Sequence, residues 1–453
     1  MSHASNGRHL TEAEALMWSL DGEPALRSSF LSITFLDHPP SPERYRRRMT
    51  EAVDAVEALR LRVVPAPLGL TPPRWEPDPD FDVDRHVRFA SLPPPGDRRH
   101  LLDLAALLSE EPFDRAHPLW QFTLVDGLED GGCALLAKMH HVVSDGVGAV
   151  RISVSFLDLA PDGNPENVAP APPAPTPTAA RSRLEPVTTA IATNASEAWK
   201  VAGAIATMVR SPGAGLRTVR SLGRQAGFAD PARSPLWRER SHRHRFETLN
   251  LDLEQLHAAA RALGGTVNDA FVTVMAAAAG EYHRALSAPV DDLRISMPIS
   301  VRHDRDVGGN AWVPARVLVP TGTMTPAARF QETSARLAAV KREPSLGLAD
   351  AFAGVFRHLP QPLLVPLARQ QVGTVDFACS NVRGAPFDLW IAGSHVESNH
   401  PMGPTAGVAF NATVLSYKQS LDLGLNIDTG AISEPGLLSQ CVVDAAAALV
   451  AAA

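Results

Sequence analysis

Cysteine and long apolar runs are both scarce in this chain, and each shortage excludes a class of protein. Three cysteines in 453 residues (Cys133, Cys379 and Cys441) cannot form a disulfide framework and have no zinc-ligand spacing, so we expect a reducing compartment. Apolar stretches such as residues 201–209 are far shorter than the ~20 residues of a membrane-spanning helix. Residues 1–10 are polar and contain no signal-peptide core. We therefore expect a cytoplasmic protein that is soluble or peripheral to a membrane.

Positive charge is in short supply as well. The chain has 42 Lys and Arg residues against 49 Asp and Glu residues, which gives a net charge of -7. This balance argues against non-specific nucleic-acid binding, so no nucleic-acid partner is expected. With 45% apolar and 20% charged residues, the composition is that of a folded globular protein rather than a disordered one.

Proline is abundant, and it is concentrated in one segment. Residues 161–186 read PDGNPENVAPAPPAPTPTAARSRLEP, where proline removes backbone donors and fixes φ. Neither a helix nor a sheet is expected there, so the segment is predicted to be an exposed, semi-extended linker. It divides the chain into an N-terminal domain, residues 1–160, and a C-terminal domain, residues 187–453.

Hydrophobic periodicity on both sides of the linker mixes helices with strands. The first predicted helix starts with a capping box formed by Thr11 and Glu14. Helices are expected at residues 11–20, 41–59, 97–108, 146–157, 187–209, 252–263 and 267–286. Strands are expected at residues 30–36, 120–128, 133–141, 246–251, 293–301, 313–320, 408–415 and 421–427, with another near Val375. The predicted fold class is α/β, with a mixed sheet in each of two domains.

The segment with the clearest chemistry is Lys138–Gly148, KMHHVVSDGVG, which contains the pattern HHxxxDG. An imidazole titrates near neutral pH, so a histidine at a strand end can act as a general base towards a hydroxyl group. Asp145 can hold the loop, and Gly146 permits a backbone conformation that a side chain would forbid. A structural role for both histidines, or a metal site, is the alternative. Adjacent side chains on a strand point to opposite faces, so His140 and His141 are poorly placed to share one metal, and no metal site is expected.

HHxxxDG is the signature of the CoA-dependent acyltransferase superfamily, and further segments make the resemblance more specific. Pro118-Leu119-Trp120 resembles the PLW motif of the bacterial wax ester synthase/diacylglycerol acyltransferase family. The other segments that resemble motifs of this family are Val267–Ala270 (ND), Pro298–Arg302 with Asn310 (PVSxR and GN), Ser380–Gly384 (SNVxGP) and Ser416–Asp428 (SYxGxLxxGLxxD). The matches follow in order from Pro118 to Asp428 and so cover most of the chain.

The resemblance implies two chloramphenicol-acetyltransferase-like domains with a channel between them. It implies that His141 is the general base, with His140 beside it in the catalytic motif, and that Asp145 is structural. The base would deprotonate the hydroxyl of a fatty alcohol or diacylglycerol, which then attacks the thioester of acyl-CoA. The product would be a neutral lipid, a wax ester or triacylglycerol. Acyl-CoA is then the donor substrate, and no permanently bound cofactor is expected.

Further residues receive roles from the resemblance. Asn268 matches the family's functional ND asparagine, with a helix N-cap as the alternative. Ser380 and Asn381 are candidates to bind the donor and stabilise the developing oxyanion, with a turn at a strand end as the alternative. Arg302, in the PVSxR-like segment, is another candidate for donor binding. Trp120 of the PLW-like segment is expected to pack in the core.

Two positions depart from the family pattern. Ala385 stands where SNVxGP has proline, and Gln419 stands where SYxGxLxxGLxxD has its first glycine. The second change falls in a predicted hairpin and leaves open which hydroxyl is acylated. The alternatives to neutral-lipid synthesis are an acyltransferase of the same fold with another acceptor, such as a secondary metabolite, and a catalytically silent lipid or CoA binder. The intact HHxxxDG pattern argues against the silent binder.

Lipid substrates add the expectation of contact with a membrane or lipid-droplet surface. Phe352–Leu367 is unusually apolar for a segment broken by prolines, and it either packs against the sheet or faces such a surface. The basic run RYRRR, residues 44–48, is expected to be a solvated helix face, with contact to CoA phosphates or anionic lipid as the alternative. A peripheral position at the inner membrane face is the corresponding expectation for localisation.

Overall fold

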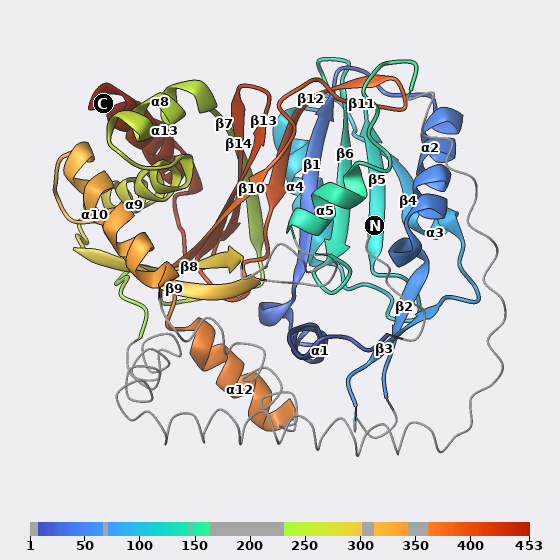
Figure 1. The fold of residues 1–453 in the computed structure, drawn as a ribbon, viewed down its shortest axis with the longest axis horizontal. Helices are drawn as coiled ribbons and strands as arrows, with labels where there is room; N and C mark the ends of the chain where they lie inside the picture. The colour runs from blue at the N-terminus through green and yellow to red at the C-terminus, as the bar shows by residue number, and fades with distance from the viewer. Residues whose placement is uncertain (1–7, 67–70, 145, 164–230, 301–311, 343–360) are drawn as a thin grey trace.

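Two six-stranded sheets lie side by side at the centre of the molecule (Figure 1). The computed structural model describes residues 8–66, 71–144, 146–163, 231–300, 312–342 and 361–453. Most helices lie on the outer sides of the two sheets, whereas α4 and α5 lie between them; the N-terminal half is on the right of Figure 1 and most of the C-terminal half is on the left. This mixed arrangement confirms the predicted α/β class.

The first sheet is built from both halves of the chain. Its spatial order is β11 (Trp390–Ile391), β12 (Ser394–Met402), β1 (Ser29–Leu36), β6 (Cys133–His140), β5 (Trp120–Asp126) and β4 (Val87–Ser91). The β4–β5 pair is parallel and the other pairs are antiparallel. β12 pairs with β1 from Val396 to Met402, with Leu31 opposite Met402 and Ile33 opposite His400. The C-terminal half therefore contributes two strands to the N-terminal sheet, which a division of the chain at the linker does not anticipate.

The second sheet comes entirely from the C-terminal half. Its spatial order is β7 (His244–Asp252), β14 (Ser420–Asp428), β13 (Phe410–Tyr417), β10 (Phe377–Arg383), β8 (Asp292–Ser300) and β9 (Trp312–Pro320). β10 runs parallel to both of its neighbours, so this sheet is mixed as well. A separate ribbon pairs β2 (Leu61–Val64) with β3 (Arg74–Pro77).

Helices flank both sheets and join them. The α-helices of the described residues are α1 (Glu12–Leu20), α2 (Pro42–Ala55), α3 (Val83–His86), α4 (Arg98–Glu110), α5 (Gly146–Ser153), α8 (Leu253–Ala262), α9 (Val267–Ala285), α10 (Pro326–Lys341), α12 (Gln361–Val372) and α13 (Pro435–Ala451), with 3-10 turns η1 (Pro24–Leu26) and η2 (Glu57–Arg60). Figure 1 shows α8, α9, α10 and α13 gathered beside the second sheet and α2 beside the first. α4 packs against both β1 and β7, and α12 packs against α1, so each of these contacts joins the two halves.

Capping residues define where the helices that carry candidate residues begin. Thr11 is the N-cap of α1, and its capping box with Glu14 is present as predicted. Thr266 is the N-cap of α9, where its hydroxyl accepts the amide of Asp269 while the Asp269 carboxylate accepts the Thr266 amide. Asn268 is therefore inside the first turn of α9, and the N-cap alternative for this residue is wrong.

The cores of the two halves are continuous. One hydrophobic cluster combines Leu31 and Leu136 of the first sheet with Phe246 of the second. A second cluster, on the opposite face of the first sheet, combines Met139 with Val382 of β10. A Cβ at Gly424 would lie 2.1 Å from the carbonyl oxygen of Pro401, so glycine at this position lets β14 approach β12 closely.

Most of the predicted elements are present, with ends that differ by a few residues. The predicted helix at residues 187–209 and most of the predicted linker lie outside the described residues, so the division at residues 161–186 stays a prediction. The helices and strands of the described residues that were not predicted are β2, β3, β4, β11, β12, α3, α10, α12 and α13. In the described ranges, no single helix has the length and apolar composition of a membrane span; α8 and α9 meet those criteria only as a pair, and they are bent by 98° at their junction.

Candidate active site

The two histidines of HHxxxDG lie where β6 ends beside the start of β1. Ser29, the first residue of β1, pairs with His140. The amide of His140 donates to the Leu119 carbonyl at 3.0 Å, and the amide of His141 donates to the Ser28 carbonyl at 2.9 Å. The amide of Val143 returns to the His140 carbonyl at 2.9 Å and closes a turn. His141 is thus the first residue of a turn that is tied to two neighbouring chain segments.

The His140 side chain points into the protein and is 1% exposed. Its Nδ1 accepts the amide of Val142 at 3.0 Å, and its Nε2 lies 3.0 Å from Oδ1 of Asp21. An amide N–H can only donate, so Nδ1 carries no proton, and Nε2 donates to the carboxylate. The two contacts hold the ring in one orientation and one tautomer.

Asp21, the C-cap residue of α1, is a site residue that the sequence does not mark. Its Oδ2 lies 3.3 Å from Nη2 of Arg115, and the same nitrogen donates to the Trp18 carbonyl at 2.7 Å. The Arg115 guanidinium also lies 3.9 Å from the centroid of the Trp18 ring. Burial alone raises the pKa of the Asp21 carboxyl, but the hydrogen bond from His140 and the positive charges nearby leave that pKa below its ordinary value. Asp21 is therefore ionised at neutral pH.

The His141 side chain points the other way, which confirms the prediction that the two histidines face opposite sides. Its ring centroid lies 4.8 Å from that of Phe30, and the side chain is partly buried. Burial, and then the neighbouring His140, lower the pKa of His141 to about 4, although a hydrogen bond with the Ser144 backbone acts in the opposite direction. A bond that raises the pKa of an imidazole must be donated by the ring, so the second nitrogen carries the lone pair. At neutral pH His141 is an uncharged ring that can accept a proton.

The candidate residues of the C-terminal half form a second group. Nδ2 of Asn381 lies 3.5 Å from Oδ1 of Asn268, and Nδ2 of Asn268 lies 3.9 Å from the sulfur of Met297. Ser380 and Asn381 are inside β10 and pair with β13, so the alternative of a turn at a strand end is wrong for them. Asn381 is exposed, and Ser380 and Asn268 are partly buried. These side chains can therefore offer hydrogen bonds to a ligand.

The histidines of HHxxxDG and the candidate residues of the C-terminal half belong to different sheets. The two halves come into contact where α5 packs against β10. α5 follows the HHxxxDG segment directly and packs against β10, the strand that carries Ser380 and Asn381. Met139, next to His140, shares a hydrophobic cluster with Val382, next to Asn381. The base and the candidate hydrogen-bond donors are thus attached to the same junction between the halves.

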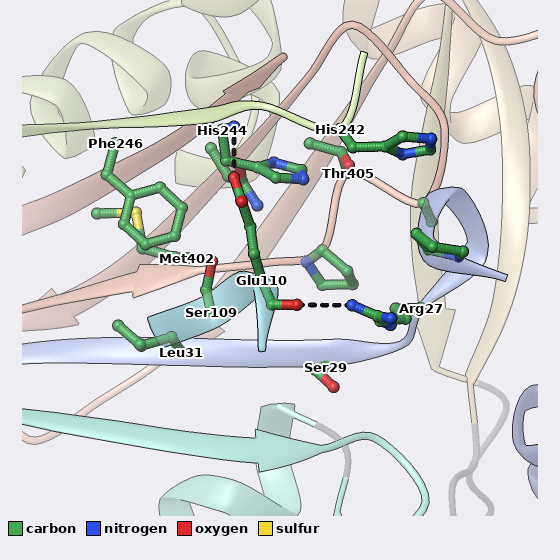
Figure 2. Close-up of a pocket in the computed structure, with 14 residues that line it drawn as sticks. Arg27, Ser29, Leu31, Ser109, Glu110, His242, His244, Phe246, Met402 and Thr405 are labelled. Atoms are coloured by element: carbon green, nitrogen blue, oxygen red, sulfur yellow. Dashed lines mark hydrogen bonds between the residues drawn. The ribbon is translucent and has the colours of Figure 1, made fainter. Parts of the chain in front are cut away.

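A cavity of about 160 Å³ lies between the two halves on the α4 side of the first sheet, and none of His140, His141, Asn268, Ser380 and Asn381 lines it (Figure 2). Ser29 and Leu31 of β1 line it from one half, and His244 and Phe246 of β7 line it from the other. Glu110, at the end of α4, joins the two sides: its carboxylate accepts the His244 amide at 2.9 Å, and its carbonyl accepts Arg27 Nη1 at 2.6 Å. The lining is mixed, with polar groups around an apolar wall.

The basic run at residues 44–48 does not form an open cationic patch. Arg46 pairs with Asp84, and Arg48 pairs with Asp158 at 2.9 Å and with Glu51 at 3.2 Å. These partners neutralise Arg46 and Arg48, which favours the solvated, paired helix face over a phosphate site.

No metal chemistry is indicated within the part of the chain that the structure describes. No group of three or more His, Cys, Asp or Glu side chains there is placed to hold a metal ion. The three cysteines belong to that part and are buried free thiols. The described site consists of an imidazole base, its supporting carboxylate and a set of amide and hydroxyl groups.

Comparison with known proteins decides the family. The profile of the wax ester synthase/diacylglycerol acyltransferase catalytic domain matches residues 10–271, and that of the C-terminal domain of the same family matches residues 309–449. The chain belongs to the wax ester synthase/diacylglycerol acyltransferase family. Among the relatives of this family member is a putative diacylglycerol O-acyltransferase of Mycobacterium tuberculosis, 31% identical over 451 residues, which cover 96% of this chain and 90% of the relative.

Solved structures agree with this assignment at the level of the fold. The wax ester synthase/diacylglycerol acyltransferase from Marinobacter aquaeolei superposes with a TM-score of 0.66 at 23% identity, covering 98% of each chain. The starter condensation domain of rhizomide synthetase, in complex with C8-CoA, superposes with a TM-score of 0.59 at 15% identity, covering 98% of this chain and 95% of that one. The predicted two-domain acyltransferase fold is confirmed.

Several motif residues of the acyltransferase family serve the framework of this member. Trp120 is 1% exposed and donates from Nε1 to the Leu59 carbonyl at 2.8 Å, as expected for core packing. Asp428 accepts the amide of Ser241 at 2.8 Å and that of Gly430 at 2.8 Å, so it anchors the segment that leads into β7. Gln419 lies in the tight turn of the β13–β14 hairpin, and its carbonyl accepts the Leu253 amide at the start of α8.

Some predicted site residues lie outside the described residues of this acyltransferase. They are Asp145, Arg302 and Asn310, together with the first part of the apolar segment that begins at Phe352. The roles that the resemblance implies for Asp145 and Arg302 stay predictions.

Proposed function

We propose that this chain is an acyl-CoA-dependent O-acyltransferase that makes a neutral lipid, either a wax ester or triacylglycerol. The observation that carries the proposal is the uncharged His141 ring, which projects from the turn at the junction of the two sheets. Membership of the acyltransferase family supports the reaction class, and the diacylglycerol O-acyltransferases among its relatives support the acceptor. The CoA-bound condensation domain of similar fold supports acyl-CoA as the donor.

In the proposed reaction His141 takes the proton of the acceptor hydroxyl while the hydroxyl oxygen attacks the thioester carbonyl carbon of acyl-CoA. The former carbonyl oxygen then carries the negative charge of a tetrahedral intermediate. Collapse of the intermediate breaks the carbon–sulfur bond, and the proton held by His141 passes to the CoA sulfur. The ester and free CoA leave, and the base is regenerated. The thioester is already activated, so no acyl-enzyme is required.

Donors that are fixed before the reaction lower the barrier to forming such an oxyanion. Asn381 and Ser380 are adjacent in β10 and face opposite sides of the strand, so only one of them can donate to a given oxyanion. Asn381 is the proposed donor, with Asn268 of α9 as the residue that orients it through the contact between their amides. Asp145 is proposed to hold the HHxxxDG loop, and Arg302 is proposed to bind the acyl-CoA donor.

Gln419 does not favour a different acceptor. Its side chain belongs to a hairpin turn, and its backbone supports the start of α8, which is a framework role. The departure from the family's glycine therefore changes the turn and gives no specific support to a small acceptor. A neutral-lipid acceptor, namely a fatty alcohol or diacylglycerol, remains the proposal.

The decisive experiment compares acceptors with purified enzyme. Palmitoyl-CoA is supplied with hexadecanol, diacylglycerol or a short-chain alcohol, and released CoA is measured with a thiol reagent while the ester is identified by chromatography. We expect ester formation with the long-chain acceptors. Ester formation with the short-chain alcohol alone would replace the neutral-lipid acceptor by a small one. Tight binding of palmitoyl-CoA without CoA release from any mixture would indicate a silent binder.

We further infer that the enzyme is cytoplasmic and sits peripherally at the inner membrane face or on lipid droplets. The support within the described residues is α12, where Leu363 is 61% exposed while its neighbour Leu364 is 3% exposed and packs inward. With a net charge of -7, binding should depend on apolar contact and change little with salt.

Flotation with liposomes tests this position. Leu363→Asp should reduce binding, whereas Leu107→Asp is the matched control because Leu107 is 64% exposed on α4. Equal loss in both variants would show that α12 is not the contact. Binding that is abolished by salt would show that charge rather than apolar contact holds the protein on the membrane.

A further inference from the structure

A buried carboxylate is bonded to the histidine that is not the proposed base. Asp21 accepts from His140 at 3.0 Å, whereas His141 contacts the Phe30 ring and the Ser144 backbone, among other groups. In a nucleophile–base–carboxylate arrangement the carboxylate contacts the base itself and stabilises its charged form. Here the carboxylate is one residue away from the base, so it cannot stabilise a protonated His141 through a direct hydrogen bond.

The chain of bonds that starts at Asp21 ends in the backbone of the turn. The carboxylate takes the Nε2 proton of His140, which leaves Nδ1 as the acceptor for the Val142 amide at 3.0 Å. The next amide, that of Val143, bonds to the His140 carbonyl. The ring and the main chain of His140 thus hold the two residues that follow His141, while the Ser28 carbonyl holds the amide of His141 itself.

Asp21 is itself held in place by groups that do not belong to the turn. Arg115 bonds its second oxygen at 3.3 Å and is fixed in turn by the carbonyl and the ring of Trp18. Asp21 caps α1, and the last turn of α1 accepts a hydrogen bond from Gln361 of α12 at the Ser19 carbonyl, at 3.0 Å. The carboxylate is therefore a rigid point against which the His140 ring is set.

We propose that Asp21 is a positioning residue for acyl transfer: its carboxylate sets the His140 ring so that Nδ1 receives the Val142 amide, and this bond fixes the turn that presents His141 to the acceptor. The inference rests on the proposed role of His141 as the base. A ring without Asp21 would keep a buried Nε2–H with no acceptor, and it could satisfy that donor only by rotating away from the Val142 amide. A displacement of the base by about 1 Å can cost about 100-fold in rate.

The test separates positioning from general stability by comparing two substitutions at one site. Asp21→Asn keeps an oxygen that can accept from His140 Nε2, whereas Asp21→Ala removes it. For Asp21→Ala we expect kcat to fall by about 10- to 100-fold, with the KM for palmitoyl-CoA near that of wild type, because the geometry of the base changes and the donor contacts do not. Asp21→Asn should recover most of this loss.

Asp158→Ala is the matched control. Asp158 is also a buried carboxylate of the N-terminal half, and it pairs with Arg48 at 2.9 Å rather than with a histidine. It should lower the melting temperature as Asp21→Ala does and leave the kcat of folded molecules near wild type. Equal kcat loss in Asp21→Ala and Asp158→Ala, or no recovery in Asp21→Asn, would overturn the positioning role.

The His141→Ala background distinguishes failure of this inference from failure of the proposed function. If His141 is the base, His141→Ala is inactive at the level of the assay and adding Asp21→Ala changes nothing further. If His141→Ala keeps its kcat, the proposed base is wrong whatever Asp21 does. If His141→Ala loses activity but Asp21→Ala keeps a normal kcat in folded protein, the base stands and the positioning role is wrong.

Discussion

Each half of the molecule buries a histidine beside a carboxylate, yet only one of the two clusters adjoins the candidate active site. In the N-terminal half, His140 is 1% exposed and donates to Asp21. In the C-terminal half, His283 is fully buried, with its Nε2 2.7 Å from Oγ of Ser234, and the amide of Ser234 donates to Asp376. By residue type the second cluster, with its serine, histidine and aspartate, is the one that looks like a nucleophilic site.

The contacts show why the second cluster is not an active site. His283 Nδ1 donates to the Ala279 carbonyl of its own helix, so Nε2 accepts the Ser234 hydroxyl. The same hydroxyl oxygen takes the amide of Trp237, whose ring lies 4.4 Å from that of His283. Every group of the cluster is satisfied inside the core and none reaches the surface. In the first cluster the neighbour of the buried histidine, His141, lies in a turn at the junction of the halves, so position in the fold rather than residue type separates the two clusters.

The largest effect that separates the two clusters is expected for His141→Ala. It should lower turnover by about 100-fold or more, as expected for loss of a general base, while the melting temperature stays near that of wild type. His140→Ala should lower turnover less and stability more, because it removes the support of the turn. CoA release at saturating palmitoyl-CoA measures turnover in both. A near-normal rate in His141→Ala would contradict the assignment of the base.

The second cluster should behave in the opposite way. His283→Ala leaves a cavity and a buried Ser234 hydroxyl without its acceptor, so the free energy of unfolding should fall by about 2–4 kcal/mol. The turnover of the molecules that remain folded should be near that of wild type. Urea unfolding followed by circular dichroism gives the first quantity, and activity corrected for the folded fraction gives the second. Loss of turnover at unchanged stability would make the buried cluster a catalytic one.

α9 links the candidate site to the second cluster, because it carries Asn268 in its first turn and His283 in its last turn. Thr266→Ala removes the N-cap and should lower the free energy of unfolding by about 1 kcal/mol. Turnover should fall as well, since the frayed first turn displaces Asn268. Thr325→Ala, at the N-cap of α10, is the matched control and should cost the same stability with no change in turnover. Equal turnover in the two variants would remove Asn268 from the site.

The smallest effect is expected from mild acid. The pKa of His141 is lowered from its ordinary 6.5 to about 4, first by burial and then by His140, so the active neutral form is lost only as the pH falls through about 4. We expect kcat/KM to stay constant from pH 8 to about 5.5, with an acid limb below that. Circular dichroism at each pH controls for unfolding, because His400, with a pKa also lowered to about 4, must be protonated when the protein unfolds in acid. An acid limb near 6.5 would show that the base is well solvated.

Local signals account for the part of this fold that the sequence predicts well. Thr11 and Glu14 form the predicted capping box, and the apolar periodicity of α4, α8 and α9 predicts helices within a few residues of their ends. Alternation along β6 predicts the opposite directions of His140 and His141. Each of these inferences depends on residues that are near one another in the chain.

The features that sequence reasoning missed depend on distant contacts. β12 reads SHVESNHPM and has polar side chains on both faces, because it lies between two sheets. The side-chain oxygen of Asn399 accepts from the Ser32 hydroxyl of β1, and the backbone amide of Asn399 donates to Asp422 of β14. Alternation cannot identify such a strand. Asp21 is 119 residues from His140, and its position after a helix gives no sign of a histidine partner.

The place of β12 has a consequence for the order in which the chain can be assembled. β1 pairs with the strand that carries His140, and Ser28 just before it holds the His141 amide. The other side of β1 has no partner until the chain has been synthesised as far as residue 402. A nascent chain therefore presents a strand edge for most of its synthesis, and such edges pair with other chains. The same constraint applies to chimeras between relatives. An exchange of halves at residues 161–186 would pair β12 of one relative with β1 of another. Moving residues 390–402 together with the N-terminal half would keep that pair of strands intact.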